Sequence, residues 1–209
     1  MTPGSKLPEP SKQVEPQTAT PTPEIEAFLQ ELFTVRDSDL RGTLLTNHGQ
    51  IDFMRMPENW VEGKPQSTLS GTSLLREFHP LDHPEVQICF FYRGQPMSSR
   101  AAEYFHSVLQ QPAHILTKVE IESLAETMWD KRNSKDFQLF LAQTEELNGK
   151  MVLVLEGRYN QIEEDTHALY IDADKTGSAV QEIYYQAPRA DYSRHLMDAL
   201  ASLKTISWK

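Results

Sequence analysis

Met151-Val152-Leu153-Val154-Leu155 decides the fold class of this 209-residue chain, because every residue in the run is apolar. A strand with one face in water alternates apolar and polar side chains, whereas an uninterrupted apolar strand has both faces buried. Ile88-Cys89-Phe90-Phe91-Tyr92 shows the same pattern earlier in the chain. We therefore predict that both segments are strands of a sheet that is covered on both sides.

Three segments have the apolar spacing of helices that could supply this cover: residues 98–110, 117–129 and 191–203. Thr117 and Glu120 stand at the spacing of a capping box, and Asp191 is predicted to cap the last helix. The sequence thus predicts an α+β fold, in which a mainly antiparallel sheet lies between helical layers as an α/β/α sandwich.

Turn residues predict the strands of that sheet. Asn148-Gly149, a strong hairpin signal, and the turn at 174–177 connect a four-stranded meander of residues 137–144, 150–159, 169–172 and 179–186. Earlier strands are predicted at 43–46, 50–55, 72–78 and 85–92. We expect the earlier strands and the meander to be two halves of one sheet, with residues 205–208 as an edge strand.

The N-terminal region differs in composition from the rest of the chain. Residues 1–23 contain six of the thirteen prolines and few large apolar side chains, which predicts a disordered tail. A tether or a polyproline-type ligand is the alternative interpretation of this tail. Residues 24–209 are predicted to form a single domain. It begins with an amphipathic helix at 25–33, whose apolar stripe could dock on the domain or on a partner.

Charge and composition exclude several classes of function. The chain has 20 Lys and Arg against 30 Asp and Glu, a formal net charge of -10, which opposes nucleic-acid binding. No apolar run approaches the ~20 residues of a membrane-spanning helix. The first residues do not read as a secretory signal peptide, and Cys89 is the only cysteine, so no intrachain disulfide forms. We expect a cytoplasmic protein.

Several motifs resemble those of the PsbP-like superfamily. Gly49-Gln50-Ile51-Asp52-Phe53 leads to Met56-Pro57-Glu58-Asn59-Trp60, a strand that ends in a proline and tryptophan turn. The Asn148-Gly149 hairpin and a last helix ending in Ser202-Leu203-Lys204 extend the resemblance over about residues 42–208. The resemblance implies an α/β/α sandwich with a binding or assembly role. Photosystem or Ran binding, known for members of the superfamily, is not carried over to any residue.

The only clustered metal-capable side chains are His79, Asp82 and His83. Two histidines and a carboxylate could hold zinc or iron, but Pro80 and Pro84 forbid helical spacing of the ligands. A proline-rigidified surface loop, His79–Pro84, is the preferred interpretation. Residues 172–177 look like the start of a calcium loop, but the twelfth position is Ile183 rather than a bidentate Glu, which favours a hairpin turn.

Other candidate chemistry is weaker. No nucleophile elbow or glycine-rich phosphate loop is present, and we predict no cofactor. Cys89 lies in an apolar strand and is predicted to be an inert core thiol. The carboxylates at 145–146 and 163–165 are predicted to be solvated charges before a turn and between strands. Trp60, Trp129 and Trp208 are interpreted as packing residues.

Together these observations favour a non-catalytic binding, assembly or chaperone-like factor whose partner is another protein. The sequence leaves two alternatives open. One is a small-molecule- or metal-binding protein, or a weak hydrolase, that uses His79, Asp82 and His83. The other is an acidic immunity or secretion-accessory protein, since a basic toxin is a natural partner for an acidic protein.

Overall fold

The computed structural model describes residues 42–64, 66–67, 74–92, 98–128 and 135–209. The predicted tail at 1–23, the predicted helix at 25–33 and Trp129 lie outside these residues.

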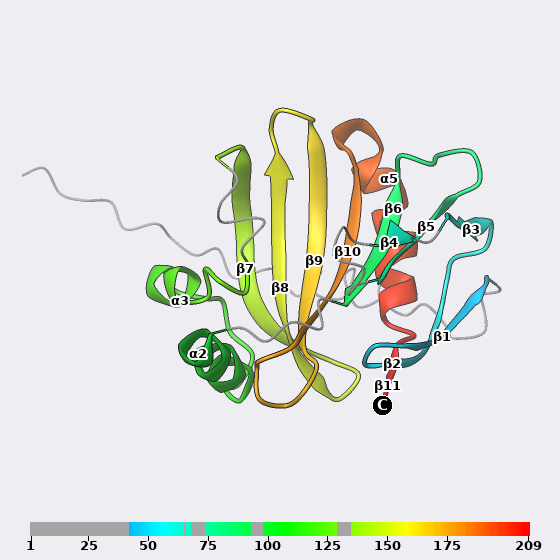
Figure 1. The fold of residues 1–209 in the computed structure, drawn as a ribbon. Helices are drawn as coiled ribbons and strands as arrows, with labels where there is room; N and C mark the ends of the chain where they lie inside the picture. The colour runs from blue at the N-terminus through cyan, green and yellow to red at the C-terminus, as the bar shows by residue number, and fades with distance from the viewer. Residues whose placement is uncertain (1–41, 65, 68–73, 93–97, 129–134) are drawn as a thin grey trace, which may run out of the picture. The chain divides into compact units, whose positions relative to one another are not determined.

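Within the described chain, eight strands form one antiparallel sheet in the order β3-β5-β6-β10-β9-β8-β7, with β4 paired to β5. Strands β7, β8, β9 and β10 follow one another in the chain and are also neighbours in the sheet, which confirms the predicted meander (Figure 1). The strands are β3 (Trp60–Glu62), β4 (Gln66–Ser67), β5 (Leu74–Pro80), β6 (Gln87–Tyr92), β7 (Phe137–Leu147), β8 (Lys150–Tyr159), β9 (Glu164–Asp172) and β10 (Val180–Pro188).

A second sheet holds the first hairpin, which corrects the expectation of one sheet. β1 (Leu44–His48) pairs with β2 (Ile51–Arg55), and β2 pairs with the C-terminal β11 (Ser207–Trp208). Because β2 has β1 on one side and β11 on the other, it has no free edge for the large sheet. The hairpin instead packs its apolar face into the core through Leu45 and Met54, both of which are fully buried.

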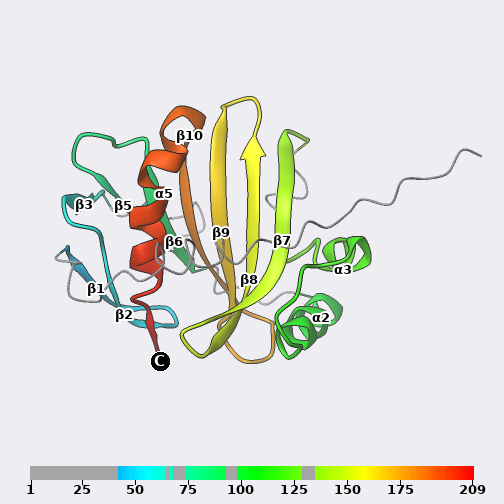
Figure 2. The same cartoon turned by 180° about the vertical axis from the view of Figure 1, so that it is seen from behind.

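Strand β8 is covered on both faces, as predicted. Val152 and Val154 belong to a core cluster that includes residues of α5 (Arg189–Leu203). Leu153 and Leu155 point the other way, into a cluster with residues of α2 (Ser99–Leu109) and of the segment around α3 (Lys118–Ser123). In Figure 2, α5 lies in front of the sheet, and in the opposite view of Figure 1 it lies behind. The α/β/α arrangement is therefore confirmed.

Strand β6 is covered less completely than its apolar sequence predicts. Ile88 and Phe90 are fully buried under the α5 layer, and Cys89 is buried on the opposite face. Phe91 and Tyr92 are half-buried. The reason is the position of α2, which packs against β8. Because β9 and β10 lie between β8 and β6 in the sheet, α2 gives β6 less cover.

The helices differ from the prediction at their ends. The predicted capping box is present, since the Thr117 side chain accepts from the Glu120 backbone and the Glu120 side chain accepts from the Thr117 backbone. However, α3 ends at Ser123, and turns continue the same apolar stripe to Met128. Asp191 is not a cap: α5 starts earlier, after Pro188, where the backbone N–H of Arg189 donates to the Glu163 carbonyl at 2.8 Å.

Candidate functional site

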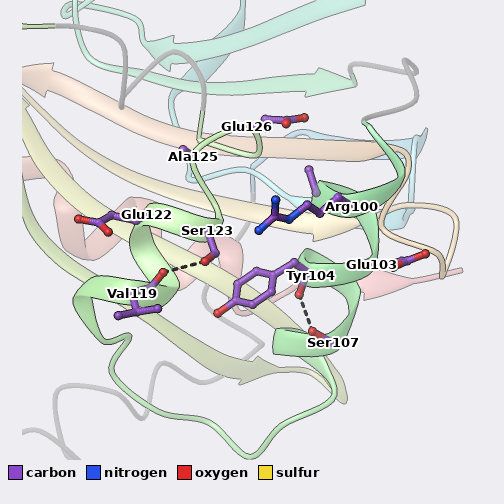
Figure 3. Close-up of a pocket in the computed structure, with 10 residues that line it drawn as sticks. Arg100, Glu103, Tyr104, Ser107, Val119, Glu122, Ser123, Ala125 and Glu126 are labelled. Atoms are coloured by element: carbon purple, nitrogen blue, oxygen red, sulfur yellow. Dashed lines mark hydrogen bonds between the residues drawn. The ribbon is translucent and has the colours of Figure 1, made fainter.

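A groove of about 740 Å³ lies between α2 and the segment that contains α3 (Figure 3). The helix α2 buries one apolar stripe, which includes Phe105 and Val108, against the sheet. Residues at the other positions of the helical repeat therefore line the groove. Those that define its character are Arg100, Glu103 and Tyr104 from α2, with Val119, Glu122 and Glu126 opposite.

A hydrogen bond and a helix cap fix the two walls of this groove. Ser98 caps α2, with its Oγ accepting from the Ala101 backbone at 3.4 Å, and the same Oγ donates to Glu126 Oε2 at 2.7 Å. This contact joins the start of α2 to the segment that follows α3. The capping box at Thr117 fixes the start of α3 in turn. The groove thus has walls set by local sequence signals.

The groove combines charge of both signs with apolar surface. Figure 3 shows the guanidinium of Arg100 reaching across towards Ser123, with Tyr104 beside it. Within the described part of the chain, Arg100 forms no ion pair. Three glutamates also line the groove, and Figure 3 shows the carboxylates of Glu103 and Glu122 pointing away from the guanidinium. Val119, which is 69% exposed, adds an apolar side chain to the α3 wall.

The two serine hydroxyls of the groove are hydrogen-bonded to the backbone of their own helices. Ser107 Oγ donates to the Tyr104 carbonyl at 2.8 Å, and Ser123 Oγ donates to the Val119 carbonyl at 2.9 Å. Neither hydroxyl is hydrogen-bonded to a histidine that could activate it as a nucleophile. The groove thus combines charged, apolar and hydroxyl-bearing side chains.

The structure does not bring together the three metal-capable residues found in the sequence. His79 is not in a loop but in β5, one residue after Phe78, whose side chain lies in the α5 layer. Alternation along a strand therefore places His79 on the opposite face of the sheet. Asp82 is exposed in the following turn, while His83 contacts His195 of α5. Among the described residues, no three His, Cys, Asp or Glu side chains are grouped as for a metal ion.

Residues 172–177 form the predicted hairpin turn. Asp172 Oδ1 accepts from the backbone of Gly177 at 3.0 Å, and Asp174 Oδ1 accepts from the backbone of Thr176 at 3.0 Å. The second oxygen of Asp172 contacts His106 Nδ1 of α2 at 2.8 Å. These carboxylates therefore hold the turn and attach α2 to it.

One of the carboxylate groups predicted to be solvated lies in a strand and is partly buried. Asp165 belongs to β9, is buried, and accepts from both Nε and Nη2 of Arg158, the latter at 2.9 Å. Burial raises the pKa of its neighbour Glu164. The physical reason is that β9 begins at Glu164, so this segment is a paired strand and not a connection. Glu145 and Glu146 likewise fall inside β7.

Cys89 and the described tryptophans behave as predicted. Burial raises the pKa of the Cys89 thiol to about 12, which leaves the thiol protonated and inert at neutral pH. Trp60 is buried in the core. Trp208 donates from Nε1 to the Leu147 carbonyl at 2.8 Å, which ties the C-terminal strand to the end of β7.

Sequence reasoning did not single out the groove residues or His195. Arg100, Glu103 and Tyr104 occupy the polar side of an amphipathic pattern, where solvated residues are expected in any helix. The one sequence signal for the groove was the presence of two successive helices, each with a capping residue at its start. His195 carried no signal, because its contact with His83 spans more than a hundred residues of sequence.

Comparisons with known proteins give a likeness in structure. No protein-family model matches the chain, and no curated protein matches it in sequence. Among solved structures, the chain is similar to cyanobacterial PsbP (CyanoP) from Synechocystis sp. PCC 6803, at 13% sequence identity and a TM-score of 0.48. The match covers 80% of this chain and 92% of that chain. The likeness concerns the fold alone.

No helix in the described residues is both long enough and apolar enough to cross a membrane.

Proposed function

We propose that this protein is a non-catalytic binding factor and that the groove between α2 and α3 receives a segment of a partner protein. The partner segment carries basic and apolar side chains. The observation that supports this proposal is the lining of the groove, which combines the carboxylates of Glu103, Glu122 and Glu126 with the exposed apolar side chain of Val119.

Charge complementarity is the reason for a basic partner. Three carboxylates and one guanidinium line the groove, and Lys118 Nζ lies 4.0 Å from Glu122 Oε1, which leaves the local charge balance negative by one, in a chain whose formal net charge is -10. Complementary charge raises the association rate and fixes the register of a bound segment. Arg100, at the centre of the groove, can donate hydrogen bonds to a carbonyl or carboxylate of the same segment.

Site-specific crosslinking in cells of the source organism tests this proposal. A photoreactive amino acid replaces Val119 in the groove or, as a matched control, Ile162, an apolar residue that is 60% exposed in the turn between β8 and β9. We expect one dominant protein adduct from position 119 and none from position 162.

Charge reversal supplies the second arm of the test. Glu103→Arg with Glu122→Arg reverses two groove carboxylates, and Glu58→Arg with Glu146→Arg makes the same change in net charge at two exposed sites elsewhere. The adduct at position 119 should disappear with the first pair and persist with the second. An adduct that survives the groove reversal, or that forms equally at position 162, contradicts the proposal.

A further inference from the structure

Two histidines far apart in the sequence lie side by side next to α5. His83 comes from the loop between β5 and β6, and His195 comes from the middle of α5. Their ring centroids are 5.2 Å apart and the ring planes are tilted by 53°. Neither histidine lines the groove between α2 and α3, so a role for this pair is independent of the proposed function.

Each ring of this pair has an Nε2 atom without a hydrogen-bond partner among the described residues. Glu85 Oε1 lies 3.0 Å from His83 Nδ1, and since a carboxylate accepts, Nδ1 donates to it and Nε2 is the nitrogen that faces away from Glu85. A carboxylate in this position orients metal-binding histidines in many proteins. The Nε2 atom of His195 is buried and has no hydrogen-bond partner. Buried polar atoms usually have one, so this nitrogen calls for an explanation.

The loop and the helix that carry the two rings are both anchored to the core. In the loop, the backbone N–H of His83 donates to the Pro80 carbonyl at 3.1 Å, and that of Val86 donates to the His83 carbonyl at 3.1 Å. Val86 is fully buried in the core below the loop. On the helix side, Ala199 of α5 is fully buried in the same cluster. The two imidazoles are thus presented by anchored elements.

The spacing of the rings fits a shared metal ion. Imidazoles bound to one tetrahedral zinc through nitrogens ~2.1 Å from the metal have ring centroids about 5 Å apart. Asp191 and Asp198 stand about one turn before and one turn after His195 on α5, and they add negative charge near the site, which favours a cation.

We propose that His83 and His195 form a two-imidazole site for a divalent transition metal of the zinc and copper class. Glu85 orients His83, and water completes the coordination. With two protein ligands, binding falls in the micromolar range or weaker, and Cu²⁺ binds more tightly than Zn²⁺. The site differs from the loop cluster found in the sequence, since it uses His83 without His79 or Asp82.

Titration calorimetry on the full chain tests this site with ZnCl₂, CuCl₂ and MgCl₂ as probes. We expect one equivalent of Zn²⁺, tighter binding of Cu²⁺ and no binding of Mg²⁺. His83→Ala and His195→Ala should each weaken Zn²⁺ binding at least tenfold. His114→Ala is the matched control, because His114 also contacts a glutamate, Glu120 at 3.1 Å, and should leave binding unchanged.

Thermal unfolding gives an independent readout. Zn²⁺ should raise the Tm of the wild type and of His114→Ala but not that of His83→Ala. If His195→Ala does not fold, His83→Ala decides the question, because its side chain lies on a surface loop. Absence of one-equivalent binding by the wild type, binding that persists in His83→Ala, or displacement of Zn²⁺ by Mg²⁺ overturns the proposal.

Discussion

Truncation of two adjacent residues in β8 tests whether the sheet is covered on both sides. Val154→Ala removes two methyl groups from the face towards α5, and Leu155→Ala removes three carbons from the face towards α2 and α3. Both side chains are fully buried. Each buried methyl or methylene contributes about 0.8 kcal/mol, and the cavity left behind adds to the loss.

The neighbours of each residue set the size of the effect. Leu155 lies across from Ala142 on one side and Ala168 on the other, and these small side chains cannot fill the cavity. We expect Leu155→Ala to cost about 3–4 kcal/mol. Val154 is paired with Leu169, which is larger and can relax into the space, so Val154→Ala should cost about 2 kcal/mol.

Denaturant unfolding followed by circular dichroism measures both losses, and the exposed β7 variant Glu146→Ala should stay within about 0.5 kcal/mol of the wild type. In thermal unfolding, the Tm should fall by about 5–15 °C in the two β8 variants. If either of them matches the Glu146→Ala control, that face of β8 is open to solvent and the layered arrangement is wrong.

Three further predictions concern a turn, an ion pair and a thiol. Gly177→Ala should destabilise the protein more than Gly149→Ala, although both glycines have positive φ. A Cβ added at Gly177 would lie 2.1 Å from the Ala102 carbonyl oxygen of α2, whereas a Cβ added at Gly149 would have no neighbour within 4 Å. The hydrogen bond from His167 lowers the pKa of Glu156, so the stabilisation relative to Glu156→Gln should be present at neutral pH and be lost as the pH falls through this lowered pKa, as urea titrations at each pH can measure. Cys89 should resist alkylation in the folded protein and react only after denaturation, as mass spectrometry can follow.

The layers of the fold could be predicted from the sequence because their signals are local. The apolar run at Met151–Leu155, the Asn148-Gly149 turn and the capping box at Thr117 each depend on a few neighbouring residues, and the structure confirms all three. The assignment of the first hairpin to its own sheet could not be predicted. It depends on β11 taking the second edge of β2, a pairing between the two ends of the described chain.

The candidate sites depend on long-range placement in the same way. His79 and His83 are close in sequence but belong to different surroundings, because β5 runs on through His79 before the chain turns. His195, which the structure places beside His83, is remote in sequence. The groove likewise forms only once Ser98 and Glu126 meet. The spacing of residues along the sequence does not predict these long-range contacts.

The affinity of the crosslinked partner for three versions of the protein tests the central functional claim most directly. The versions are the wild type, the groove reversal of Glu103 and Glu122, and the control reversal of Glu58 and Glu146. In equilibrium titrations at one salt concentration, we predict about tenfold weaker binding for the groove reversal and less than about twofold for the control. Equal weakening in both, or none in the groove reversal, would contradict binding through the groove between α2 and α3.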